Sequence, residues 1–190
     1  MVSLDRDDLI DGLRELIAEL QAAGQPSGIR IVGGAALALH YFDRRTTVDI
    51  DALIRPEAET IAAAERVAER RGWQSDWLNS KAAGFLPLGR SAEWEPLFDD
   101  GEISVWAASA ETLLAMKLRA SRPGRDTDDI ADLMGICGID SVEAAEELYE
   151  SFYRGEVLEP KAYRILDAIL ARGTPAAPTA PPPPDLRPRR

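Results

Sequence analysis

The sequence has very little of the two residue types on which most zinc and triad sites depend. It contains one cysteine, Cys137, and one histidine, His40, in 190 residues. A single cysteine excludes an internal disulfide and fits a reducing compartment. The same scarcity excludes a zinc site of the Cys/His kind, and no nucleophile-elbow motif lies near His40 to form a Ser-His-Asp triad. Any chemistry must therefore be carried mainly by carboxylates, lysine and arginine.

Long apolar runs are also missing. The longest, residues 29–42, is interrupted by glycine, arginine and histidine, and it is too short and too polar to span a bilayer. The chain opens on an acidic helical pattern rather than on a signal-peptide pattern. We therefore expect a cytoplasmic protein that has no membrane partner.

Positive charge is scarce, and lysine is scarcer still. The chain has 22 basic and 33 acidic residues, and its net charge is −11. This charge argues against broad electrostatic binding of nucleic acid, although it leaves a local basic groove open. Arginine abundance beside so much alanine is typical of a GC-rich genome and carries no functional message. The few lysines are therefore more informative: Lys81, Lys117 and Lys161.

Apolar periodicity and turn residues predict two kinds of structure along the chain. The first part alternates helices and strands, and the part after Ser109 is all helical. In the first part the expected elements are a helix over 5–23, a strand over 29–32, a helix from 33 to 42, a strand over 45–54, a helix over 57–71 and a hairpin over 94–107. After Ser109, helices are expected near 112–121, 126–137, from 140 onward and over 160–171.

This order predicts an α/β (α+β) fold, in which a mixed sheet with flanking helices precedes a helical C-terminal half. The predicted domains are an α/β core over 1–108 and a helical part over 109–172. Residues 173–190 are rich in proline and are expected to form a disordered or polyproline-type tail.

The segment RTTVDIDALI, residues 45–54, places two aspartates one residue apart in a strand-like run. In an extended strand Arg45, Thr47, Asp49 and Asp51 share one face, because alternate residues point the same way. A pairing of Arg45 with Asp49 is poor, since their backbones lie about 13 Å apart. Two carboxylates this close repel each other unless a cation lies between them. They suit Mg²⁺ (or Mn²⁺), which takes oxygen ligands and leaves positions open for a triphosphate.

Gly33-Gly34 follows the first predicted strand and opens a predicted helix. Backbone N–H groups at such a turn favour phosphate, and glycine permits a close approach of the ligand. Taken alone, the glycine pair indicates no more than a tight turn between a strand and a helix.

Together, Gly33-Gly34, a short helix and then Asp49-Ile50-Asp51 on a strand resemble the signature of the polymerase β-like nucleotidyltransferase superfamily. The fourteen residues between Gly34 and Asp49 are slightly more than the usual spacer. The resemblance implies that Asp49 and Asp51 bind metal. We expect the nucleotide phosphates to dock at Gly33, Gly34, Arg45 and Thr47, the last two because they share the strand face of the aspartates. Members often carry a third carboxylate on a neighbouring strand. Asp99, Asp100 and Glu102 are candidates for this role, but none of them is assigned to it.

Residues 113–133, LLAMKLRASRPGRDTDDIADL, resemble a segment of the AbiEii-type nucleotidyltransferases, the toxin halves of toxin–antitoxin and phage-defence pairs. By this resemblance Lys117 contacts the nucleotide phosphates, Asp126 completes the catalytic site and Asp129 supports it. Each residue also has a purely structural interpretation. Lys117 fits a lysine at a helix edge with a buried stem, and the acids fit the N-terminus of a helix, where they stabilise the dipole.

These features predict a Mg²⁺-dependent nucleotidyltransferase that transfers a nucleoside monophosphate from a nucleoside triphosphate to an acceptor hydroxyl. The resemblance points to a tRNA 3′ end as the acceptor and to a cognate antitoxin as a partner. Two alternatives stay open: a non-catalytic module that binds a nucleotide or a partner, and an enzyme that modifies a small molecule.

Overall fold

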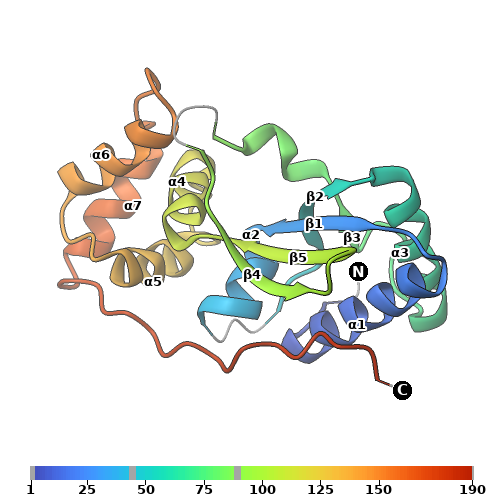
Figure 1. Cartoon of the computed structure of the whole chain (residues 1–190). Coiled ribbons are helices and arrows are strands. Elements are labelled where there is room, and N and C mark those ends of the chain that lie inside the picture. The colour runs from blue at the N-terminus through green and yellow to red at the C-terminus, as the bar shows by residue number, and fades with distance from the viewer. Residues whose placement is uncertain (1–2, 43–45, 88–90, 190) are drawn as a thin grey trace. The chain divides into compact units, whose positions relative to one another are not determined.

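The computed structural model describes residues 3–42, 46–87 and 91–189 (Figure 1). The chain divides into two compact units. Unit 1 contains the described residues of Met1–Gly84, Trp94–Ala108 and Ala180–Arg190, and unit 2 contains those of Phe85–Glu93 and Ser109–Thr179. None of the helices in the described ranges is long and apolar enough to cross a membrane.

Unit 1 is built on a five-stranded mixed sheet, which confirms the predicted fold class. The strand order is β3-β2-β1-β5-β4. β1 runs antiparallel to β2 and parallel to β5, and β2 runs parallel to β3. β4 and β5 form the predicted antiparallel hairpin. The strands are β1 (Ser27–Val32), β2 (Ile50–Arg55), β3 (Leu78–Asn79), β4 (Trp94–Asp99) and β5 (Ile103–Ala108). The helices are α1 (Arg6–Ala22), α2 (Gly33–Ala36) and α3 (Glu57–Arg71), with a π-helix over Leu37–Tyr41 and a 3₁₀ helix over Lys81–Phe85.

One face of this sheet forms the core of unit 1. Alternate residues of the three central strands point to this face and are at most 5% exposed: Ile29, Ile31, Ala52, Ile54, Val105 and Ala107. Helix α1 contacts both α3 and β5, and its apolar stripe is fully buried. Asp5 begins α1 with a capping box, in which its side chain and that of Asp8 accept each other's backbone N–H. The opposite face carries half-buried residues, among them Asp51.

The strand predicted over 45–54 is wrong in its first half, because β2 begins only at Ile50. Thr47 instead forms an isolated bridge with Leu4, in which each backbone N–H donates to the other residue's carbonyl at 2.7 and 2.9 Å. The Thr47 hydroxyl donates to the Asp49 carbonyl at 3.2 Å, and the chain bends at Val48. Val48, which an unbroken strand would point to the same face as the buried Ile50, is 37% exposed. The local hydrogen bonds therefore replace the ladder that a longer strand would need.

Unit 2 consists of the predicted helices, α4 (Ala110–Ala120), α5 (Thr127–Cys137), α6 (Val142–Phe152) and α7 (Pro160–Leu170). Ser109 caps α4, with its side chain accepting from the Thr112 N–H. The helix expected from 140 onward begins at Val142, and its cap Ser141 accepts from the Ala144 N–H.

The C-terminal end of the chain, Ala180–Arg190, belongs to unit 1. It runs beside α1, as Figure 1 shows in red. Arg14 Nε donates to the Asp185 carbonyl at 2.6 Å, and Leu186 is only 1% exposed. Through these contacts the C-terminal segment packs against α1. The disorder expected over 173–190 stays a prediction, which a Leu186 variant tests.

Candidate functional site

The glycine pair and one of the two aspartates meet at the end of β1. Val32, the last residue of β1, pairs with Asp51 on β2, and Gly33 follows with a φ of +64°. That backbone conformation is left-handed, which glycine adopts at little cost and other residues rarely adopt. A Cβ atom placed on Gly33 would lie 3.6 Å from Asp51 Oδ2. The Asp51 carboxylate therefore lies beside the Gly33 turn, as the sequence pattern predicts.

The second aspartate is held by the neighbouring strand. Asn79 on β3 pairs with Asp51 in register, and its Nδ2 donates to Asp49 Oδ2 at 3.1 Å. The side chain of Asn79 is buried, so this hydrogen bond fixes the direction of the Asp49 carboxylate. Both aspartates thus lie at the edge of the sheet where β2 begins.

Two other predicted nucleotide contacts do not join this arrangement. The Thr47 hydroxyl is used locally on the Asp49 carbonyl, and the bend at Val48 breaks the continuous row of side chains expected along one strand face. Arg45 lies outside the described residues. The roles of Thr47 and Arg45 in binding a nucleotide stay predictions.

The acids considered for a third carboxylate lie at the other end of the sheet. Asp99 Oδ1 accepts from the Gly101 N–H, and Asp100 Oδ1 accepts from the Ile103 N–H, so both shape the β4–β5 turn. The register places this turn beside Ser27, whereas Asp51 pairs with Val32 at the far end of β1, about 16 Å away at about 3.3 Å per residue. The position next to Asp51 on the neighbouring strand is instead occupied by an amide, Asn79.

Unit 2 brings together Lys117, Asp126 and Asp129, the three residues that the family resemblance places in the site. Lys117 Nζ on α4 donates to Asp126 Oδ1 and to Asp129 Oδ2, each at 2.7 Å. All three residues are buried, with exposures of 5%, 0% and 6%. Arg122 adds two guanidinium hydrogen bonds and one backbone N–H to Asp126, at 2.8 to 3.0 Å. This network joins α4 to the start of α5, and a contact of Lys117 with phosphate stays a prediction.

The network determines the charge of Asp126. Burial raises the pKa of this carboxyl, but the hydrogen bonds from Arg122 and Lys117 and the charge of Lys117 outweigh it. The pKa of Asp126 therefore lies well below its ordinary value, and the group is ionised at neutral pH. A carboxylate with so low a pKa is a weak base, and its oxygens already accept from Lys117 and Arg122.

The aspartate pair fits a magnesium ion to a limited extent. Among the described residues, no three histidine, cysteine or acidic side chains come together in a group that could hold a metal. Asp49 and Asp51 would supply two carboxylates and leave the other positions to water and phosphate oxygens. Mg²⁺ is commonly bound in this way, by one or two carboxylates together with substrate phosphates.

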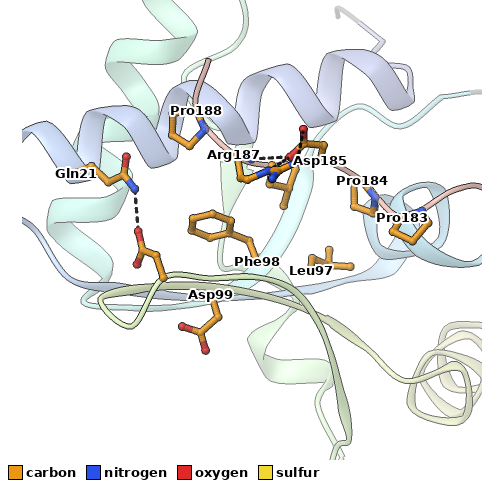
Figure 2. Close-up of a pocket in the computed structure, with 11 residues that line it drawn as sticks. Gln21, Leu97, Phe98, Asp99, Pro183, Pro184, Asp185, Arg187 and Pro188 are labelled. Atoms are coloured by element: carbon orange, nitrogen blue, oxygen red, sulfur yellow. Dashed lines mark hydrogen bonds and ion pairs between the residues drawn. The ribbon is translucent and has the colours of Figure 1, made fainter. Parts of the chain in front are cut away.

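A cavity of about 660 Å³ lies elsewhere in unit 1, between the end of α1, β4 and the C-terminal segment (Figure 2). Its charged groups are largely engaged, because Arg187 pairs with Asp185 and Asp100 accepts from Gln21 at 2.8 Å. The cavity contains none of the predicted site residues.

Sequence reasoning missed Asn79 and Lys81, which lie next to the aspartate pair. Lys81 begins the 3₁₀ helix after β3, and its N–H donates to Asn79 Oδ1 at 2.9 Å. β3 is only two residues long, so it leaves no alternating pattern in the sequence. The rarity of lysine in this chain was the one signal that favoured Lys81.

The comparisons agree with the predicted superfamily. No curated protein and no solved structure matches the chain at a significant level. One family model matches residues 9–167, and its description is a nucleotidyltransferase of unknown function, DUF6036. This match supports the assignment to the nucleotidyltransferases, but it does not support the AbiEii-type family. With most of its length matched, the chain belongs to this nucleotidyltransferase family, DUF6036.

Proposed function

We propose that the chain is a metal-dependent nucleotidyltransferase, which transfers a nucleoside monophosphate from a nucleoside triphosphate to an acceptor hydroxyl and releases pyrophosphate. The observation that carries this proposal is the pairing of Val32 with Asp51, which puts a carboxylate beside the left-handed Gly33 turn. Membership in a nucleotidyltransferase family gives that geometry its chemical context.

The residues of unit 1 would divide the work between metal and phosphate. Asp49 and Asp51 would hold Mg²⁺ or Mn²⁺, which when bound neutralises charge on the triphosphate. Gly33 and Gly34 present backbone N–H groups without side chains in the way, which suits a phosphate oxygen. Asn79 keeps the Asp49 carboxylate in place through its hydrogen bond at 3.1 Å.

The residues of unit 2 enter the proposal through the family resemblance. Lys117 would contact the phosphates, Asp126 would orient or deprotonate the acceptor, and Asp129 would support them. The low pKa of Asp126 makes it a weak base, which favours the orienting role over deprotonation of the acceptor.

The finer proposal concerns the acceptor and the biological setting. By resemblance to AbiEii-type enzymes, the acceptor is a tRNA 3′ end, and the chain is the toxin of a toxin–antitoxin pair that a cognate antitoxin protein restrains. A net charge of −11 restricts any tRNA contact to a small area around the site rather than a broad surface.

One observation favours a second candidate function, namely nucleotide binding without transfer. Asn79 stands beside Asp51 on the neighbouring strand, where polymerase β-like enzymes often carry a third carboxylate, and an amide cannot serve as a general base. A small-molecule acceptor is the third outcome that the same experiment distinguishes.

The test is incubation with each α-labelled nucleoside triphosphate and Mg²⁺, with total tRNA, the protein itself or small hydroxyl compounds as acceptor. Label on RNA supports the finer proposal, and label on a small compound supports the third candidate. Asp51→Asn should abolish transfer, whereas Asp167→Asn, the same change at an exposed residue of α7, should not. Mg²⁺-dependent nucleotide binding without label on any acceptor supports the second candidate. Absence of both label and binding refutes the proposal.

A further inference from the structure

One cation lies next to the aspartate pair, and its backbone is fixed there. Lys81 follows the two-residue strand β3, and Asn79 links it to the pair with both ends of its amide. Asn79 Nδ2 donates to Asp49 Oδ2, and Asn79 Oδ1 accepts from the Lys81 N–H. Asn79 itself pairs with Asp51 across the strands, so the backbone of Lys81 is anchored two residues from that pair.

The head of the Lys81 side chain is held much less firmly. Its Nζ donates to Asp76 Oδ2 at 2.5 Å, and the two side chains are 63% and 53% exposed. An ion pair exposed to this extent contributes little to stability, so the ammonium group can exchange partners readily. Lys81 therefore combines a fixed backbone with a side chain that can change its contacts.

The electrostatics of Lys81 include the aspartate pair. The hydrogen bond with Asp76 raises the pKa of Lys81, desolvation opposes this, and the charges of Asp76, Asp49 and Asp51 each raise it further. The ammonium group thus interacts favourably with both carboxylates of the site. A cation in this position offsets the repulsion between Asp49 and Asp51 when no metal is bound.

We propose that Lys81 is a counter-cation of Asp49 and Asp51 that acts from its ion pair with Asp76, and that its ammonium group moves to the triphosphate when nucleotide and a divalent cation bind. This inference rests on the proposed function, because it takes a nucleotide as the ligand. A divalent cation at the carboxylates repels the ammonium group, and the nearest new anions are then phosphate oxygens. Lysine suits this exchange, since its charge is compact and its stem has four rotatable carbons.

The proposal predicts that Lys81→Met changes two affinities in opposite directions. Without nucleotide, Mn²⁺ should bind about three- to tenfold more tightly, because a positive charge near the carboxylates is removed. In the presence of Mg²⁺, a fluorescent nucleoside triphosphate analogue should bind about three- to tenfold more weakly, because a phosphate contact is lost. A residue with a purely structural role would not tighten the binding of a metal.

The experiment measures free Mn²⁺ by electron paramagnetic resonance and the nucleotide analogue by fluorescence anisotropy. Lys161→Met is the matched control and should change neither affinity, because Lys161 lies on α7 in a partly exposed pair with the N-cap residue Glu159. Lys81→Arg keeps the charge and should keep the wild-type Mn²⁺ affinity. Thermal melting of each variant checks the fold.

The outcomes also separate this inference from the proposed function. If the wild-type chain binds Mn²⁺ but no nucleotide, the proposed function fails, while tighter Mn²⁺ binding by Lys81→Met still supports the counter-cation role. If the wild-type chain binds both and Lys81→Met leaves either affinity unchanged, the inference is overturned and the proposed function stands. Absence of all binding overturns both.

Discussion

Replacement of Lys117 by methionine tests whether the buried network of unit 2 holds its first two helices together. The ammonium group bonds Asp126 and Asp129 at 2.7 Å each, and its side chain is only 7% exposed. Methionine keeps most of the apolar stem, so the change removes the charge with little loss of packing. Two buried carboxylates then lose their shared cation. Removing one partner of a buried ion pair costs about 3–5 kcal/mol.

A loss of this size is a large share of the 5–15 kcal/mol that stabilises a typical domain. For a chain of this length, each kcal/mol corresponds to a shift of about 2–4 °C in Tm. We therefore expect Tm to fall by roughly 6–20 °C and the urea midpoint to fall with an unchanged slope. Arg122→Met should cost less, because the Arg122 side chain is 48% exposed and water can replace its contacts.

The measurement is urea unfolding at pH 7, followed by circular dichroism, for the wild-type chain, the two single variants and Lys117→Met/Asp129→Asn. The double variant should recover part of the loss, because it leaves one buried carboxylate instead of two. If Lys117→Met unfolds within 1 kcal/mol of the wild type, or if the double variant is less stable than the single one, the reasoning about this network is wrong.

Three further predictions address other parts of the chain. The pKa of Asp126 is lowered on folding, so its contribution to stability is complete above the unfolded pKa of about 3.9 and is lost as the pH falls toward the folded value. The difference in unfolding free energy between wild type and Asp126→Asn should therefore be constant from about pH 5 to 8 and shrink below about pH 4. A difference that stays constant at low pH would contradict this. Gly12→Ala places a Cβ 2.7 Å from the Trp73 ring and 3.0 Å from that of Trp77, so overpacking should outweigh the gain in helix propensity and cost about 1 kcal/mol in urea unfolding; a stabilised variant would show that the rings yield freely. Leu186→Asp should lower the unfolding free energy by about 1.5–3 kcal/mol, because the side chain is 1% exposed, whereas an unchanged Tm would show that the C-terminal segment is undocked and disordered in solution.

The fold was largely predictable because local signals agreed with the global structure. Capping residues fixed where helices begin, as Ser109 does for α4, and Gly72 ends α3 in a left-handed conformation. The turn Asp99-Asp100-Gly101 marked the hairpin. Two elements were missed or misjudged for physical reasons. β3 has only two residues, and the first half of the strand over 45–54 gave way to hydrogen bonds between Thr47 and Leu4, which no local pattern reveals.

The candidate site was predictable only in part, because its two kinds of residue leave different marks in a sequence. The paired acids Asp49 and Asp51 stand out, since charge interrupts an otherwise apolar strand pattern. Asn79 and Lys81 do not stand out, because they lie between the short β3 and a 3₁₀ helix, where neither periodicity nor packing constrains the residue type.

The acids therefore predict a cation, while its identity depends on contacts across the sheet. The repulsion between Asp49 and Asp51 can be reduced either by Lys81 or by a divalent cation. If both can do so, a bound divalent cation repels the ammonium group of Lys81, and nucleotide phosphates accept it. On this reasoning, removal of Lys81 without loss of the fold should convert an exchange site into a simple metal site, with high affinity for Mn²⁺ and low affinity for nucleotide.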